Sequence, residues 1–365
     1  MKLRILDFLR CPDCKEYLRA ERFDGSGDEI ETGVLHCKGG HLFPVVGGIP
    51  RMLPSSFEDN WREISEKIPR PAPPTLGALI EERKLNVTSK AYDTKTKANF
   101  SNEWDNHDIG GKTWTMELGD RIKWFFLDPI KIDREDLNGK IMLDAGCGNG
   151  SQSVAYTEFG LEVIALDLST GLEKGYAYRN LRKEARADKV HFVQADLQNP
   201  PLAPDSFDII HSAGVLHHTP NTEKTFRALR PLLKEGGTFY VWLYKYEKVV
   251  TPIVNSIRTI TTRLPAPTFA QIANATAVPF IGFCWAIDKL GIRRYQTPSF
   301  REAKIAVHDI FGAPYAHYHS FEEVSTWFKS VGIDEVWPVN EDRRGFGICG
   351  RAVQGTDENS NVAGH

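Results

Sequence analysis

An aspartate followed by three alternating glycines is the pattern with the clearest chemical meaning in this sequence. The stretch IMLDAGCGNG, residues 141–150, ends an apolar run at Asp144 and continues through Gly146, Gly148 and Gly150. A dinucleotide-binding turn has the spacing G-x-G-x-x-G and faces a pyrophosphate. Here one residue, and not two, separates Gly148 from Gly150, and the Asp144 carboxylate would repel phosphate. The pattern therefore indicates a cationic ligand close to the backbone, and S-adenosylmethionine fits because it carries an ammonium, a sulfonium and no phosphate.

Two further aspartates end the next apolar runs, LEVIALD at Asp167 and VHFVQAD at Asp196. Strand ends of this kind meet at one edge of a parallel sheet, where ligands bind. We expect Asp167 to accept both ribose hydroxyls, and Asp196 with the Leu197 amide to contact the adenine edge. Each aspartate alone could be a cap or turn residue, but three at successive strand ends favour a cofactor site. The remaining residues assigned to this site are Asn149, Leu168 and Ser212.

Four residues near the beginning of the chain have the spacing of a zinc site: Cys11 and Cys14 in one knuckle, Cys37 and His41 in a second. Three thiolates and an imidazole can close a tetrahedron around Zn²⁺ and leave no place for water, so the site would be structural. Buried or redox-active thiols are the alternative, and His36 is a competing fourth ligand. We expect the metal to stabilise this small module and its loss to leave cofactor affinity little changed.

From residue 138 onward, strand-like runs alternate with helix-like segments, which predicts an α/β fold with a doubly wound, Rossmann-like parallel sheet. Capping boxes are expected at Thr170–Glu173 and Ser320–Glu323, and one helix is expected to run from residue 221 to the Gly236-Gly237 pair. The expected domains are a zinc ribbon (1–54), a linker (55–97), a cofactor-binding core with N-terminal lid helices (98–245), a helical insertion (246–315), the last helix and final strands of the core (316–354) and a disordered tail (355–365).

Two family resemblances follow from these motifs. LDAGCGNG, VIALDLS, VQADLQNPPLAPDSFDII and SAGVLHH resemble, in order and spacing, the class I S-adenosylmethionine-dependent methyltransferases, particularly the ubiquinone and menaquinone branch. CPDC with LHCKGGHLFPVVGGIPRML resembles the zinc-ribbon family that activates tRNA and protein methyltransferases. The first resemblance implies a seven-stranded sheet with an added antiparallel final strand, for which FGICGRAV (346–353) is the candidate. It also implies lid helices, and Trp104 and Arg121 are the candidate lid residues.

A general base is required only if the methyl acceptor arrives protonated. Histidine titrates near neutral pH and suits this role. His217, after the fourth predicted strand, is the first candidate; His317, His319 and Tyr315, in a loop before the last helix, are the others. For any single histidine, a packing or capping role is the simpler interpretation.

Composition limits the remaining possibilities. The formal net charge of −3 gives no global attraction to nucleic acid or anionic lipid. MKLRILDFLRCPDC has no signal-peptide pattern, and ATAVPFIGFCWAI is too short to span a bilayer, so a cytoplasmic protein without a membrane segment is expected. The apolar insertion suggests a substrate with hydrophobic surface or a homodimer contact. The leading prediction is a small-molecule methyltransferase; an rRNA or tRNA methyltransferase that docks RNA through the ribbon, and a non-catalytic scaffold, are the alternatives.

Overall fold

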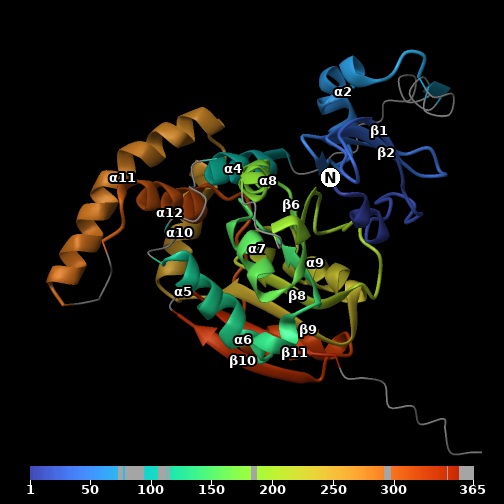
Figure 1. Ribbon diagram of the computed structural model, residues 1–365. Coiled ribbons are helices and arrows are strands. Elements are labelled where there is room, and N and C mark those ends of the chain that lie inside the picture. The colour runs from blue at the N-terminus through green and yellow to red at the C-terminus, as the bar shows by residue number, and fades with distance from the viewer. Residues whose placement is uncertain are drawn as a thin grey trace, which may run out of the picture.

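The computed structural model describes residues 1–72, 77–78, 94–105, 112, 116–181, 187–291, 297–342 and 344–352. Residues 73–76 and 79–93 of the predicted linker, and the whole predicted tail, lie outside these residues, whereas the described start of the predicted linker forms helices over Ser56–Asp59 and Trp61–Lys67. The described part forms a main α/β body with a small β-rich domain on one side and a helical layer on another (Figure 1).

The main body is built on a seven-stranded sheet with the order β10-β11-β9-β8-β5-β6-β7. Five strands run parallel because helices cross over between them. The last two form an antiparallel pair, and β11 lies antiparallel to β9. The predicted seven-stranded sheet and antiparallel final strand are confirmed. The bounds are β5 (Ile141–Ala145), β6 (Glu162–Asp167), β7 (Val190–Gln194), β8 (Phe207–Ala213), β9 (Leu233–Tyr244), β10 (Glu335–Glu341) and β11 (Gly345–Arg351).

The crossover helices depart from expectation in two places. The Ser320–Glu323 capping box is present at α13, but Glu173 instead accepts from the Arg51 guanidinium at 2.8 Å. The helix expected to reach Gly236-Gly237 ends at Leu229, and β9 begins at Leu233, because Pro231 cannot continue the helical hydrogen bonds. The helices are α7 (Ser151–Tyr156), α8 (Leu172–Leu181), α9 (Thr222–Leu229) and α13 (Phe321–Ser330).

The N-terminal domain is a four-stranded antiparallel sheet that packs against the β7 side of the main sheet. The Met52 N–H donates to the Gln194 carbonyl at 2.8 Å, and Leu9, Phe43 and Met52 share one hydrophobic core with the main body. Packing against the body therefore stabilises this domain, in addition to any metal. Its elements are β1 (Arg19–Asp24), β2 (Thr32–His36), β3 (Leu42–Val46), β4 (Ile49–Pro50), α1 (Ser56–Asp59) and α2 (Trp61–Lys67).

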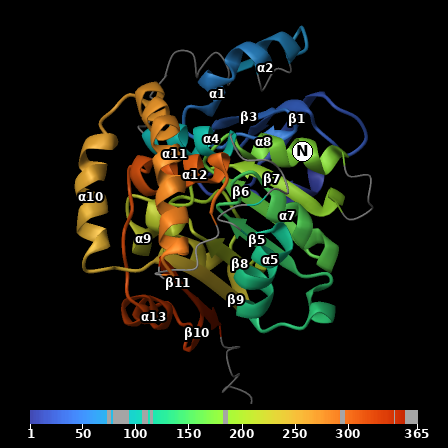
Figure 2. The ribbon, with the colours of Figure 1, turned by 90° about the vertical axis from the view of Figure 1, so that its left-hand side faces the viewer.

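Helices that precede the main sheet, and others inserted between its strands β9 and β10, pack around it. α4 (Thr94–Asp105), α5 (Leu118–Ile122) and α6 (Asp128–Ile130) precede the sheet, and α10 (Val250–Thr261), α11 (Ala266–Lys289) and α12 (Phe300–Gly312) form the predicted insertion (Figure 2). The expectation that the apolar segment is too short to span a bilayer is wrong. α11 continues through Pro279, and by its length and composition Thr268–Lys289 is long and apolar enough to cross a membrane.

Candidate active site and metal centre

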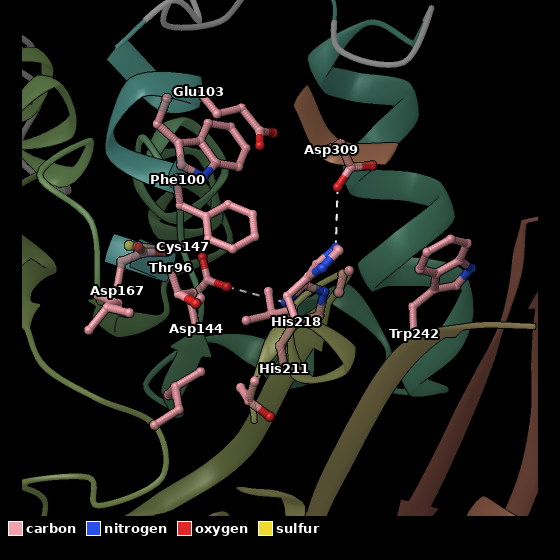
Figure 3. Close-up of a pocket in the computed structure, with 18 of the residues that line it drawn as sticks. Thr96, Phe100, Glu103, Asp144, Cys147, Asp167, His211, His218, Trp242 and Asp309 are labelled. Atoms are coloured by element: carbon pink, nitrogen blue, oxygen red, sulfur yellow. Dashed lines mark hydrogen bonds and ion pairs between the residues drawn. The ribbon is translucent and has the colours of Figure 1, made fainter. Parts of the chain in front are cut away.

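A deep pocket lies at the carboxyl ends of β5, β6, β7 and β8, under α4 and beside α12. Its lining holds several carboxylates, and the side chains converge from strands and helices that lie far apart in the chain (Figure 3). The carboxylates that line it belong to Glu103, Asp144, Asp167, Asp196 and Asp309. Such a lining favours a ligand that carries positive charge and disfavours phosphate.

The glycine-rich loop and α4 close the pocket together. Gly148 has a φ of +59°, and a Cβ there would lie 2.5 Å from the indole of Trp104. Only glycine therefore permits this backbone turn and the close approach of Trp104. The Asp144 carboxylate at the end of β5 accepts from the Ser153 hydroxyl at 2.6 Å and lies 3.3 Å from Nδ1 of His211.

Asp167 is held rigidly at the end of β6. Its two carboxylate oxygens accept the N–H groups of Gly148 and Ser169, each at 2.8 Å. Burial raises the pKa of Asp167, although these N–H donors oppose that effect. Each oxygen keeps a second lone pair, so the carboxylate can still accept hydroxyl hydrogens from a ligand. Asp196 is oriented in the same way, by the Gln198 N–H at 2.9 Å.

The predicted cofactor residues divide into two groups. Those that line the pocket are Trp104, Asp144, Gly146, Asp167, Leu168, Asp196 and Leu197. Gly148, Asn149, Gly150 and Ser212 support the loop and strands behind the lining, and the Ser212 hydroxyl donates to the Ala145 carbonyl. Arg121 is not a lid residue: it is buried away from the pocket lining because α5 packs against α7.

The structure also corrects the choice of His217 as the base. This side chain is fully buried outside the pocket lining, and its ring stacks on Tyr244 with centroids 3.8 Å apart. Burial and the neighbouring His218 lower the pKa of His217 well below its usual range. A helical turn at 216–218 points the next residue, His218, into the pocket instead.

The late loop carries supporting groups rather than lining groups. His317, His319 and Tyr315 do not line the pocket. Nδ1 of His319 lies 3.1 Å from the Glu323 carboxylate, and the Tyr315 carbonyl accepts from Nδ1 of His218 at 2.8 Å. These residues fix the loop and the orientation of His218.

A polar group that joins the 216–218 turn, α12 and the end of β9 was not predicted as a unit, although the sequence pointed to Asp309 as a candidate for substrate contact. Nε2 of His218 lies 3.2 Å from the Asp309 carboxylate, which also accepts the Tyr244 hydroxyl at 2.5 Å. Burial alone would raise the pKa of Asp309, but the contacts with His218 and Tyr244 lower it. Asp309 is 165 positions after Asp144 in the chain, and no motif joins them.

Glu103, by contrast, is a residue that the sequence did not single out. It is 3% exposed, lines the pocket from α4, and its Oε2 has no hydrogen-bond partner among the described residues. Burial, and then the charges of Asp309 and Asp167, raise the pKa of Glu103 well above its usual range. A carboxylate in this setting is a stronger base than an exposed one.

The four predicted metal ligands come together at the N-terminal domain. Their ligand atoms all lie within 4.8 Å of one another: Nδ1 of His41 is 3.4 Å from the Cys11 sulfur and 3.3 Å from the Cys37 sulfur, and the Cys14 and Cys37 sulfurs are 3.5 Å apart. A zinc tetrahedron with these ligands has edges of ~3.5–3.8 Å. The residues therefore fit zinc, whereas His36 faces Glu21 at 3.9 Å.

The first metal knuckle touches the loop that begins at Asp196. Lys15 donates to the Asn199 side chain at 2.6 Å, and Asn199 in turn donates to the Pro12 carbonyl at 3.0 Å. The Arg10 N–H donates to the Pro201 carbonyl at 2.9 Å. The knuckle thus positions a wall of the pocket, which the sequence did not predict.

Comparison with protein families agrees with this architecture. Residues 143–241 match the family described as a methyltransferase domain, and residues 2–48 match the family described as Trm112p-like protein. Two separate parts of the chain thus match a methyltransferase domain and a Trm112p-like protein, and these matches confirm both resemblances drawn from the sequence.

The individual curated relatives resemble only part of this chain. A ubiquinone biosynthesis O-methyltransferase of Xanthomonas campestris is 31% identical over 40% of this chain and 62% of its own length, and a sterol 24-C-methyltransferase of Gibberella zeae is 34% identical over 29% and 28%. The chain spans between about a quarter and two thirds of such curated relatives. A solved complex of the Haloferax volcanii Trm112 methyltransferase activator with a putative methyltransferase is 14% identical, covers 73% of this chain and 100% of that one, and has a TM-score of 0.40, a similarity too weak to carry a conclusion.

Proposed function

We propose that this protein transfers the methyl group of S-adenosylmethionine to a nucleophilic atom of a small or medium organic molecule. The observation that carries the proposal is the acidic pocket at the strand ends of a methyltransferase domain. When bound there, the cofactor supplies an electrophilic methyl group on a sulfonium.

The residues of the pocket have distinct expected roles toward the cofactor. Asp144 favours its cationic amino-acid end, and Asp167 accepts its ribose hydroxyls. Asp196 and Leu197 contact the adenine, and Trp104 covers the site from α4. These assignments are supported by the lining and by the hydrogen bonds that hold the aspartates in place.

Glu103 is the group best suited to remove a proton from the acceptor. If the acceptor is a hydroxyl, Glu103 would accept its O–H proton as the acceptor oxygen takes the methyl group that the bound cofactor would supply. The His218–Asp309 pair lies in the same pocket and holds the acceptor in line. Burial under α4 and α12 excludes water from this step.

The acceptor class is inferred from relatives. The named relatives are, by name, an O-methyltransferase of ubiquinone biosynthesis and a 24-C-methyltransferase of sterols; from them we take only that the acceptor is a small organic molecule. The test is incubation of the protein with methyl-labelled cofactor and a fractionated small-molecule extract. Label is expected in an organic-soluble product. Label found only in RNA or protein would contradict the proposal.

RNA docking by the ribbon is the less favoured alternative. Residues 1–54 hold eight Lys and Arg against eight Asp and Glu, and three of the basic side chains pair with carboxylates of the main body: Lys2 with Asp188, Arg4 with Glu162 and Arg51 with Glu173. The segment therefore has no excess of positive charge to attract phosphates. Salt-dependent RNA binding would favour the alternative.

Zinc at the four-ligand site is expected at one ion per chain, measured by elemental analysis. Cys37→Ser should lose it. Because the knuckle holds the loop of Asp196, we now expect this change to weaken cofactor binding by about fivefold or more, in contrast to the independence expected from the sequence. Cys284→Ser, in α11, is the matched control and should change neither zinc content nor affinity. An unchanged affinity in zinc-free, folded Cys37→Ser protein would show that the two sites are independent.

A further inference from the structure

The exposed apolar surface of this protein is concentrated on the helical insertion. Within the described part of the chain, all large exposed apolar side chains except Leu3 and Tyr17 lie between Tyr246 and Phe300. A concentration of exposed apolar side chains on one part of a protein marks contact with a partner or a membrane. α10 and α11 carry most of these side chains. Each packs against α12, and Figure 2 shows α10 at the left edge of the molecule and α11 nearer the viewer.

α10 is amphipathic in the reverse sense to an ordinary surface helix. Its inward face holds Thr251 and Arg258, which are buried, and the Arg258 guanidinium donates to the Ala313 carbonyl. Its outward face carries Ile253, Ile257 and Ile260, which are 57%, 41% and 66% exposed. A helix that turns isoleucines outward and an arginine inward is not adapted to water on its outer side.

α11 shows the same outward apolarity over a greater length. Phe269, Ala273 and Ala277 are buried, and Phe269 and Ala273 pack with Val307 of α12. On other faces, Val278, Phe283 and Trp285 are exposed. One side of α11 packs on α12, so the helix remains part of the folded protein. Its other sides can contact a bilayer surface without α11 crossing the bilayer.

Charge is arranged at the ends of this surface. No charged residue lies between Arg263 and Asp288, and the acidic residues that the structure describes beside the ends of the two helices are Glu247 and Asp288. Lys248 precedes α10, Arg263 follows it, and Lys289 ends α11. An uncharged apolar centre with basic ends and an exposed tryptophan is the pattern of helices that lie in the interface of an anionic membrane.

We propose that α10 and α11 form a docking surface for an anionic lipid bilayer, on which the protein lies without spanning it. A second copy of the chain is the competing occupant. The apolar helix favours lipid, because Thr268–Lys289 has the length and apolarity of a helix that contacts a bilayer and only 17% of its most apolar window is buried inside the protein. α12 lies between the surface and the pocket: Val307 packs on α11 while Asp309 lines the pocket.

The test is flotation of the full-length protein with vesicles. We expect binding to vesicles with about 30% anionic lipid and weaker binding to neutral vesicles. Salt at ~0.5 M should remove the electrostatic part of the binding and leave the part that comes from apolar contact. The double change Ile253→Asp and Ile257→Asp, and separately Phe283→Asp, should each weaken binding by at least ~10-fold. Tyr17→Asp, at the exposed apolar residue of the N-terminal domain, is the matched control and should bind as the unchanged protein does.

Sedimentation in the absence of lipid completes the test. A monomer that binds vesicles supports the proposal. The proposal would be overturned if the protein is a dimer, the same substitutions in the insertion dissociate that dimer, and no vesicle binding is found. The surface would then belong to a second copy of the chain. Vesicle binding unaffected by all insertion changes would also overturn it. Cofactor affinity, measured on each variant, reports folding independently, so failure of this proposal is distinguishable from failure of the methyltransferase assignment.

Discussion

Replacing Asp167 with alanine is expected to weaken S-adenosylmethionine binding by about ten- to a hundredfold, equivalent to ~1.5–3 kcal/mol. The change removes the acceptor of two ribose hydroxyls and also frees the N–H groups of Gly148 and Ser169. The measurement is titration calorimetry of the purified protein. Asp188→Ala, at an exposed aspartate that pairs with Lys2, is the control and should leave affinity unchanged.

Asp167→Asn separates ligand contact from loop support. The asparagine carbonyl oxygen can still accept a hydrogen bond from one backbone N–H, but the negative charge and the second acceptor oxygen of the carboxylate are lost. We expect most of the loss of affinity to persist in this variant, with a melting temperature closer to that of the unchanged protein. If both variants bind the cofactor normally, the ribose is not held by Asp167 and the cofactor pose is different.

Glu103→Gln is expected to lower turnover by roughly a hundredfold while cofactor affinity changes little, because it removes the base but keeps the shape of the pocket. The turnover of the unchanged enzyme should rise with pH through the raised pKa of Glu103, as the carboxylate form appears. The variant should lack that step. Glu117→Gln, at an exposed glutamate that pairs with Lys112, is the matched control.

The same substitution has an expected effect on stability with a defined sign. A carboxyl group whose pKa is raised by folding favours the folded state below its unfolded pKa, and that contribution is lost as pH rises through the folded pKa. Above that pH, Glu103→Gln should therefore melt at a higher temperature than the unchanged protein, and near pH 4 the two should converge. Undiminished turnover in Glu103→Gln would transfer the role of base to the His218–Asp309 pair, which His218→Ala and Asp309→Asn would then test.

Features encoded by local spacing were predictable. The Asp144–Gly150 turn, the strands that end at Asp167 and near Asp196, and the Cys11–His41 ligand set each lie within a short segment whose pattern has a direct physical meaning. Glycine permits the backbone turn, apolar runs form buried strands, and short cysteine spacing forms a metal knuckle. Parallel pairing then brings the strand ends to one edge.

Features that depend on distant segments were not predictable in the same way. Whether His217 or His218 faces the pocket depends on one turn of helix after β8, and periodicity does not determine it. Arg121 was placed in a lid because it lies in an aromatic-rich segment, but the packing of α5 on α7 turned it away from the pocket. The length of α11 was underestimated because a proline and polar residues divide its apolar run in the sequence.

The sequence by itself determined a methyltransferase-type sheet, its acidic strand ends and a four-ligand metal site, because those depend on neighbours within a few residues. Only the tertiary structure decided that Glu103, His218 and Asp309 share one pocket, since they come from three elements joined by long connections. It also decided that the metal knuckle holds the Asp196 loop and that α10 turns its isoleucines outward. Such contacts arise from the packing of whole elements, which minimises exposed apolar surface over the entire fold and is not written in any one segment.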